Sequence, residues 1–215
     1  MGVDVEAIKR RNTVVGLPEK ANAVTLKERI ESRLKGISIE GPLLIGSTEV
    51  ANGHQYVDLM GATTDPAVAV QFARDLAAHW RNLIDERKVA VDYEIDFVCT
   101  PKSGSPFLGY EFARILGLPF MVHNADLKFR RDPDIAQAHF DCRTMPHKGA
   151  RGLLVDDSST GGGKARQAID DLRGFGYLVS DFLVVFAPTI KRANGQDAAT
   201  RLHAADVNLH WIVET

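Results

Sequence analysis

The sequence predicts an α/β protein with a doubly wound, mostly parallel sheet flanked by helices, together with a small N-terminal cap. Apolar runs of strand length alternate with segments of helical period from about residue 66 onward, the pattern of a parallel sheet covered by helices. The run DFLVVFA at 181–187 is almost entirely apolar, which is typical of a strand buried on both faces. A further apolar run, RGLLV at 151–155, leads through a glycine-rich turn into another helical segment.

The first long helix of this unit is expected to begin at residue 66. Asp65 can cap it, and Pro66 occupies the first helical position, where its missing N–H is tolerated. Apolar residues then recur at spacings of three and four as far as Ile84. This stripe predicts one buried face, and Trp80 within it is expected to be a core residue without a functional role.

The remaining elements follow in the order strand, helix, strand, long loop, strand, helix, strand. Gly117 is expected to end one of these helices, because glycine readily adopts the left-handed conformation at a helix terminus. A last strand near the C-terminus is expected at an edge of the sheet. The predicted strands are 94–99, 119–123, 151–155, 181–187 and 207–213, and the predicted helices are 105–116 and 163–173.

The N-terminal portion differs from this alternation. Thr25 to Glu28 forms a capping-box sequence that opens a short helix, and strands are indicated at 43–45 and 55–59. At 215 residues the chain is long enough for one substantial core and short for two. We therefore expect a single domain over 1–215, with 1–60 as an N-terminal extension and cap.

Composition excludes several classes of function. The formal net charge of −2 provides no broad attraction to nucleic acid or to anionic lipid. No run approaches the roughly 18 apolar residues of a membrane span, and the N-terminus lacks the apolar core of a signal peptide. Cys99 and Cys142 have neither the spacing of a metal site nor a nearby pair of His residues. We expect a cytoplasmic protein without nucleic-acid or membrane partners.

The segment 124–150 shows little periodicity and is too long for a simple connection in a compact domain. Two interpretations remain open for it: a mobile arm that closes on an anionic ligand, or a solvated charged loop without catalytic duty. Its charged and histidine residues include Lys128, Arg130, Arg131, His139, Arg143, His147 and Lys148.

The string from Gly152 to Lys164 carries the most chemical information. Its strand delivers Asp156 and Asp157 to the carboxyl end of the sheet, where open α/β folds place their ligands. Adjacent side chains in a strand point to opposite faces, so the two acids need not share one role.

The turn after these acids has the composition of a phosphate cradle. Its glycines allow close approach to a ligand, and the free N–H groups at the start of the next helix favour an anion. A structural turn without a ligand is the alternative. The cradle residues are Ser158, Ser159 and Thr160 as hydroxyl donors, Gly161, Gly162 and Gly163 as the turn, and Lys164 as a positive charge.

Two familiar nucleotide motifs do not fit this string. A Walker A loop needs Ser or Thr after Gly163 and Lys164, but Ala165 follows them. The dinucleotide pattern G-x-G-x-x-G fails because position 166 is Arg.

The string instead resembles the signature for 5-phosphoribosyl diphosphate (PRPP) of the type I phosphoribosyltransferases. In that signature an apolar strand leads to two acids, a loop rich in Thr and Gly, and a helix. Ser158 and Ser159 replace the usual small apolar pair, and Gly161 replaces a Thr or Ala. The matching residues are Val155, Asp156, Asp157, Thr160, Gly162 and Gly163.

The segment 100–106 (TPKSGSP) stands where this family binds diphosphate, in a short loop after an earlier strand. The resemblance implies that Lys102, Ser103 and Gly104 supply charge and backbone donors there. A plain Pro/Gly turn before a helix is the alternative.

Among the branches of the family, the sequence is similar to the orotate phosphoribosyltransferases. The segment 52–59 (NGHQYVDL) carries their pattern of Gly, Tyr and Asp ahead of a long helix, but lacks the Lys that precedes the Gly. Ala187 and Pro188 stand where members have an Asp-Arg pair that contacts the base. Lys191 or Arg192 are candidates to replace that pair.

The resemblance implies an Mg²⁺-dependent phosphoribosyltransferase of nucleotide metabolism. It would join orotate or a related pyrimidine to PRPP, release diphosphate and act as a homodimer. Asp156 and Asp157 would hold the ribose hydroxyls and the metal, mainly through water, and Thr160 to Lys164 would bind the 5-phosphate. Lys128 and Arg130, or Arg131, would close over the diphosphate that Lys102 meets.

Two alternatives remain open from the sequence. The first is a regulatory protein of the same fold that senses PRPP or a nucleotide without catalysis. The second is a transferase for a purine or a specialised heterocycle.

Overall fold

The computed structural model describes residues 22–45, 48–50, 55–89, 94–129, 132, 134–159, 161–187 and 197–214. Its main sheet has the strand order β10-β9-β8-β5-β6-β7, and all neighbouring strands are parallel except the pair β6 and β7. The predicted fold class is confirmed. The strands are β5 (Phe97–Pro101), β6 (Phe120–His123), β7 (Phe140–Asp141), β8 (Gly152–Ser158), β9 (Asp181–Ala187) and β10 (Asn208–Glu214).

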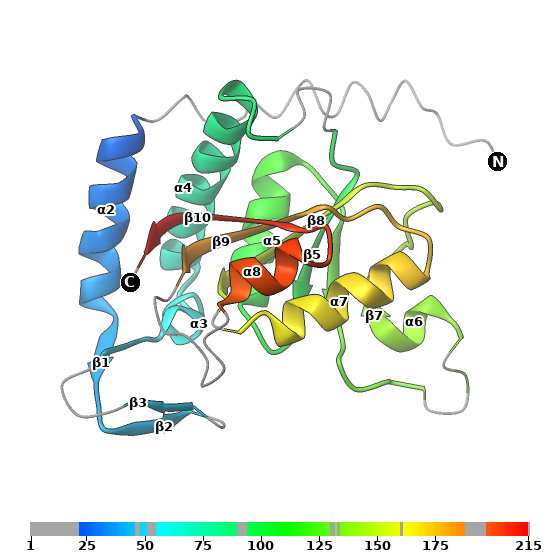
Figure 1. The fold of residues 1–215 in the computed structure, drawn as a ribbon, viewed down its shortest axis with the longest axis horizontal. Coiled ribbons are helices and arrows are strands. Elements are labelled where there is room, and N and C mark those ends of the chain that lie inside the picture. Colours follow the sequence, from blue (N-terminus) through cyan, green and yellow to red (C-terminus); the bar gives the residue numbers. More distant parts are fainter. Residues whose placement is uncertain are drawn as a thin grey trace.

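Helices cover both faces of this sheet (Figure 1). Within β8, Leu153 and Val155 pack with α4 and α5, whereas Leu154 between them packs with α7. Residues of β9 alternate between the same two cores, because successive side chains of a strand point to opposite faces. The covering helices are α4 (Pro66–Asp85), α5 (Pro106–Leu116), α7 (Gly163–Gly174) and α8 (Ala198–His203).

The N-terminal elements form two small antiparallel hairpin-like pairs beside this sheet. The helix α2 begins one turn earlier than the capping box predicts, because Asn22 caps it by accepting from the N–H of Val24 (2.9 Å). The predicted strand 55–59 is shorter in the structure, since Asp58 caps a following helix. The elements are α2 (Ala23–Gly36), β1 (Ser38–Glu40) paired with β4 (Gln55–Val57), β2 (Leu43–Ile45) paired with β3 (Thr48–Val50), and α3 (Leu59–Ala62).

A cluster of charges fixes α2 on α4. Arg29 and Arg33, one helical turn apart on α2, both bind the carboxylate of Asp75 on α4. Asp75 is buried, and its burial is tolerated because two guanidinium groups satisfy it. The guanidinium of Arg33 also lies 5.8 Å from the centre of the Phe72 ring. This cluster joins the N-terminal elements to the helix that covers the sheet.

The segment 124–150 is less irregular than the sequence indicates. It contains the short helix α6 (Ala136–His139) and the edge strand β7, in which Asp141 pairs with Val122 of β6. A four-residue helix and a two-residue strand are too short to produce a visible period, and the interpretation of this segment as one long loop is therefore wrong in part.

Both cysteines are free thiols, and Cys99 is buried in the core. Within the described ranges, no helix combines the length and the apolar character that crossing a membrane requires.

One histidine of the α4–β10 interface is held in the neutral state. Burial lowers the pKa of His79 to about 4, and the nearby charges of His210 and Lys88 act in the same direction. Glu86 and a hydrogen bond to the backbone of Trp211 oppose this shift but do not cancel it. The folded protein therefore binds a proton at His79 only near pH 4, whereas an unfolded chain does so near pH 6.5.

We predict that His79 contributes to a loss of stability as the pH falls from about 6.5 to about 4. In this window the unfolded state binds more protons than the folded state, so acid favours unfolding. The contribution at pH 5 relative to pH 7.5 is up to about 2 kcal/mol. Urea unfolding of wild type and His79→Leu at the two pH values measures it, and the variant should lose less stability. His203→Leu, an exposed position on α8, serves as control; equal losses in all three proteins would contradict the assignment.

Candidate functional site

Two of the predicted segments meet at the carboxyl edge of the sheet. The backbone N–H of Ser105, in the turn after β5, donates to Oδ1 of Asp156 at the end of β8 (2.7 Å). A Cβ atom at Gly104 would lie 2.1 Å from the same oxygen, so only glycine permits this approach. Since β5 and β8 are parallel neighbours, their carboxyl ends bring the two segments together. The predicted diphosphate loop and the predicted acids therefore form one site.

The two acids have different surroundings. Asp156 is 8% exposed and accepts a second hydrogen bond from the backbone N–H of Asp157 (2.9 Å). Burial and then the charge of Asp157 raise the pKa of Asp156 well above its usual range. Asp157 is half-buried and accepts from the backbone N–H of Ser158 (2.6 Å). Burial also raises the pKa of Asp157, and hydrogen bonds from Ser105 and Ser158 partly offset that effect.

This pair of acids fits a magnesium ion that is held largely by ligand oxygens and water. Among the described residues, no group of three or more His, Cys, Asp or Glu is arranged to hold a metal. Mg²⁺ commonly takes only one or two carboxylates together with phosphate oxygens and water. The charge of Asp157 raises the pKa of Asp156, and a divalent cation beside them would relieve that repulsion.

The glycine turn leads directly into α7, and its N-cap residue makes no side-chain hydrogen bond to the start of the helix. Gly162 is the N-cap residue, with a left-handed φ of 65° and no side chain to cap the helix. The first backbone bond here runs from the N–H of Arg166 to the carbonyl of Gly162 (2.8 Å). Gly163 and Lys164 are exposed and Ser159 is buried, whereas Thr160 lies outside the described residues. An uncapped helix start of this kind attracts anions.

The predicted basic residues have different surroundings in the structure. Lys102 and Ser103 are exposed at the tip of the turn after β5, and the N–H of Lys102 donates to the carbonyl of His123 (2.8 Å). Lys128 instead forms an ion pair with Asp141 of β7. Arg130 and Arg131 lie outside the described residues, as do Pro188, Lys191 and Arg192.

The N-terminal cap also reaches the acids. Burial raises the pKa of Tyr56 on β4, and the charges of Asp58 and Asp157 raise it further. The Tyr56 hydroxyl is therefore within electrostatic reach of Asp157. The sequence pattern at 52–59 includes this tyrosine, but only the fold brings it to the site.

One helix at the site was missed by sequence reasoning. Arg201 of α8 donates from Nη1 to the carbonyl of Gly161, so α8 contacts the glycine turn directly. Asp197 caps α8 by accepting from the N–H of Thr200 (2.7 Å). The Asp at the start of DAATRL was the available signal, although the helix spans too few residues to show a period.

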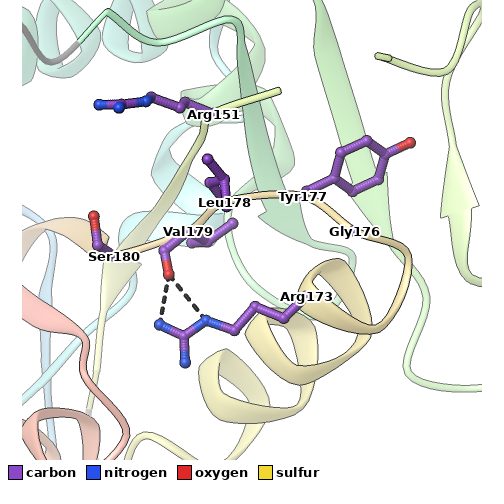
Figure 2. Close-up of a pocket in the computed structure, with 7 residues that line it drawn as sticks. All are labelled: Arg151, Arg173, Gly176, Tyr177, Leu178, Val179 and Ser180. Carbon is purple, nitrogen blue, oxygen red and sulfur yellow. Dashed lines mark hydrogen bonds between the residues drawn. The ribbon is translucent and has the colours of Figure 1, made fainter. Parts of the chain in front are cut away.

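A cavity of about 560 Å³ lies away from this edge. Figure 2 shows Arg173 within it, donating to the carbonyl of Val179. Its residues precede β8 or β9 in the chain, so it lies at the amino ends of these strands rather than beside the acids. The lining residues are Arg151, Arg173, Gly176, Tyr177, Leu178, Val179 and Ser180.

Comparison with curated proteins finds orotate phosphoribosyltransferases. The enzyme of Campylobacter jejuni subsp. doylei is 24% identical over 153 residues, which are 69% of this chain and 64% of that protein. That of Nitratiruptor is 24% identical over 169 residues, 77% of this chain and 73% of the relative. The match thus spans less than two thirds of the Campylobacter protein. No protein-family model matches the chain.

Comparison with solved structures finds the same fold. An orotate phosphoribosyltransferase of Mycobacterium tuberculosis aligns with a TM-score of 0.63 at 17% identity, covering 88% of this chain and 96% of the other. UMP synthase of Leishmania donovani gives 0.61 at 20% identity, over 91% of this chain and 37% of that one. Adenine phosphoribosyltransferase of Thermoanaerobacter pseudethanolicus aligns with a TM-score of 0.54 at 14% identity, covering 86% of this chain and 99% of the other. The chain has the phosphoribosyltransferase fold, and its resemblance to the type I phosphoribosyltransferases, including the orotate branch, is confirmed.

Proposed function

We propose that the protein is a phosphoribosyltransferase that joins orotate or a related pyrimidine to PRPP, with Mg²⁺, and releases diphosphate. The observation that carries this proposal is the contact between Asp156 and the turn at Ser105. That contact brings the acids and the diphosphate turn to one edge, with the uncapped start of α7 directly after the same strand. The relatives named orotate phosphoribosyltransferase support the same reaction.

In the proposed reaction, a ring nitrogen of the base attacks the anomeric carbon of PRPP. The new C–N bond forms as the C–O bond to diphosphate breaks, and the electron pair of that bond leaves with the diphosphate. A base that enters as its anion has no proton to lose. The protein contributes positioning and electrostatic stabilisation rather than a nucleophile of its own.

The two acids divide the binding of the sugar between them. Asp157 is the more exposed of the two and accepts hydrogen bonds from the ribose hydroxyls. Asp156 holds the diphosphate turn by accepting a hydrogen bond from the backbone N–H of Ser105. Mg²⁺, when bound, neutralises charge on the departing diphosphate. The acids meet it mainly through its water shell, and Thr160 to Lys164 hold the 5-phosphate.

The basic residues act on the diphosphate. Lys102 is exposed on the turn and meets it directly. Lys128 reaches the diphosphate only after its ion pair with Asp141 breaks, so its approach accompanies a movement of the segment after β6. Arg130 or Arg131 closes over the diphosphate together with Lys128 and excludes water that would hydrolyse the activated sugar.

A homodimer is part of this proposal. Phe107 and Tyr110 lie three residues apart on α5 and are 54% and 52% exposed. Such an exposed aromatic face suits a second copy of the chain.

A PRPP sensor without catalysis is the second candidate. It is favoured by Ala187, which ends β9 where orotate phosphoribosyltransferases continue into the pair that contacts the base. Calorimetry with PRPP and a diphosphate-release assay over a panel of bases distinguish the two functions. Tight binding without release for any base would support the sensor.

We predict that Asp156→Asn and Asp157→Asn each lower diphosphate release by at least about 100-fold, because both remove charge that orients the sugar and the metal. Asp170→Asn changes an exposed acid that pairs with Arg166 on α7, and this control should retain activity. Circular dichroism and thermal unfolding verify that all three proteins fold. Wild-type rates in the first two variants would defeat the assignment.

We predict that Gly104→Ala weakens binding of PRPP roughly 10- to 100-fold, because its Cβ would displace either the turn or the carboxylate of Asp156. Gly174→Ala is the matched control, since a Cβ there meets nothing within 4 Å. Titration calorimetry with PRPP and Mg²⁺ measures both affinities. If Gly104→Ala binds as tightly as the control, the turn does not bind this ligand.

A further inference from the structure

Arg201 is a cation that lies beside the glycine turn. Its Nη1 group donates to the carbonyl of Gly161, and its side chain is partly buried. No ion pair recorded among the described residues involves Arg201. Arg201 and Gly161 are 40 residues apart in the chain, so only folding brings them together.

Other partly buried arginines of the protein have their charge satisfied. Arg29 and Arg33 share the carboxylate of Asp75. Arg173 donates to the carbonyl oxygens of three residues, at 179, 205 and 206. Among the described residues, Arg201 donates only to the carbonyl of Gly161, so its positive charge adds to the positive potential of the turn.

Packing of α8 holds Arg201 in this place. A Cβ at Gly162 would lie 3.5 Å from Cγ of Leu202 and 3.6 Å from the carbonyl oxygen of Ala198, so the turn and α8 are in contact. Leu202 is fully buried, and Asp197 caps the start of the helix. Figure 1 shows α8 lying beside the beginning of α7.

The bond to Gly161 also fixes the direction of a backbone N–H. In a trans peptide unit, the carbonyl of one residue and the N–H of the next point in opposite directions. Because Arg201 holds the carbonyl of Gly161 toward α8, the N–H of Gly162 points away from α8. A carbonyl oxygen turned toward a phosphate would repel it, and Arg201 prevents that orientation.

From these contacts we infer that Arg201 is a positioning residue of the 5-phosphate subsite. It orients the peptide unit between Gly161 and Gly162 so that the N–H of Gly162 is directed toward the phosphate. This inference rests on the proposed function, because it takes a phosphorylated sugar as the ligand. Arg201 lies outside the motif that identified the turn.

The test uses ribose 5-phosphate, which carries the 5-phosphate without the diphosphate, and inorganic diphosphate with Mg²⁺ as the second probe. Arg201→Ala should bind ribose 5-phosphate roughly 10- to 100-fold more weakly than wild type and bind diphosphate unchanged. The KM for PRPP should rise in proportion, while kcat at saturating PRPP changes less than threefold, on the order of the scatter between related variants. Arg201→Lys should recover part of the affinity.

Arg81→Ala, which removes an exposed arginine paired with Asp85 on α4, is the matched control and should bind both probes as wild type does. If wild type binds ribose 5-phosphate and Arg201→Ala binds it equally well, the inference is overturned and the proposed function stands. An equal loss for both probes shows a general structural role and also overturns it. If wild type binds neither probe, the proposed function fails and the inference with it. Should Arg201→Ala not fold, Arg201→Lys and Arg201→Gln, compared with each other, separate charge from hydrogen bonding.

Discussion

The arrangement of the site depends on one hydrogen bond, from the backbone N–H of Ser105 to the carboxylate of Asp156. A carboxylate that is 8% exposed is costly unless donors satisfy it, and here two backbone N–H groups do so. The turn after β5 approaches closely enough because residue 104 is glycine. This bond therefore places the turn and the acids at one edge, next to the start of α7.

Much of the fold could be predicted because its signals are local. Leu153 and Val155 pack in one core and Leu154 packs in the other, so three consecutive apolar residues are enough to indicate a strand buried on both faces. The helix from Pro66 repeats its apolar face over five turns of sequence, which makes its period plain. Six elements were missed, and each contains six residues or fewer: β1, β3, α3, α6, β7 and α8. Elements of that length are stabilised by tertiary contacts rather than by a pattern of their own.

The same distinction applies within the site. A phosphate cradle is built from consecutive backbone groups, so the turn at 161–163 could be proposed as one from its own residues. The partner of Lys128 could not be predicted from the sequence, because Asp141 becomes its neighbour only when β7 pairs with β6. Arg201 was missed for a related reason: its contact with Gly161 requires α8 to pack against the turn.

The two halves of the site also differ in how their specificity arises. In the proposed function the sugar phosphate would meet backbone N–H groups and two acids, which the parallel pair β5 and β8 brings to one edge. In the proposed function the base half would depend on side chains from other elements, and Tyr56 on β4 of the cap lies within electrostatic reach of Asp157. Asp157 would contact the ribose in that function, and its charge also raises the pKa of Tyr56. Because the cap and the glycine turn belong to different parts of the chain, a change at Tyr56 would act on the site from the cap while the turn stays intact.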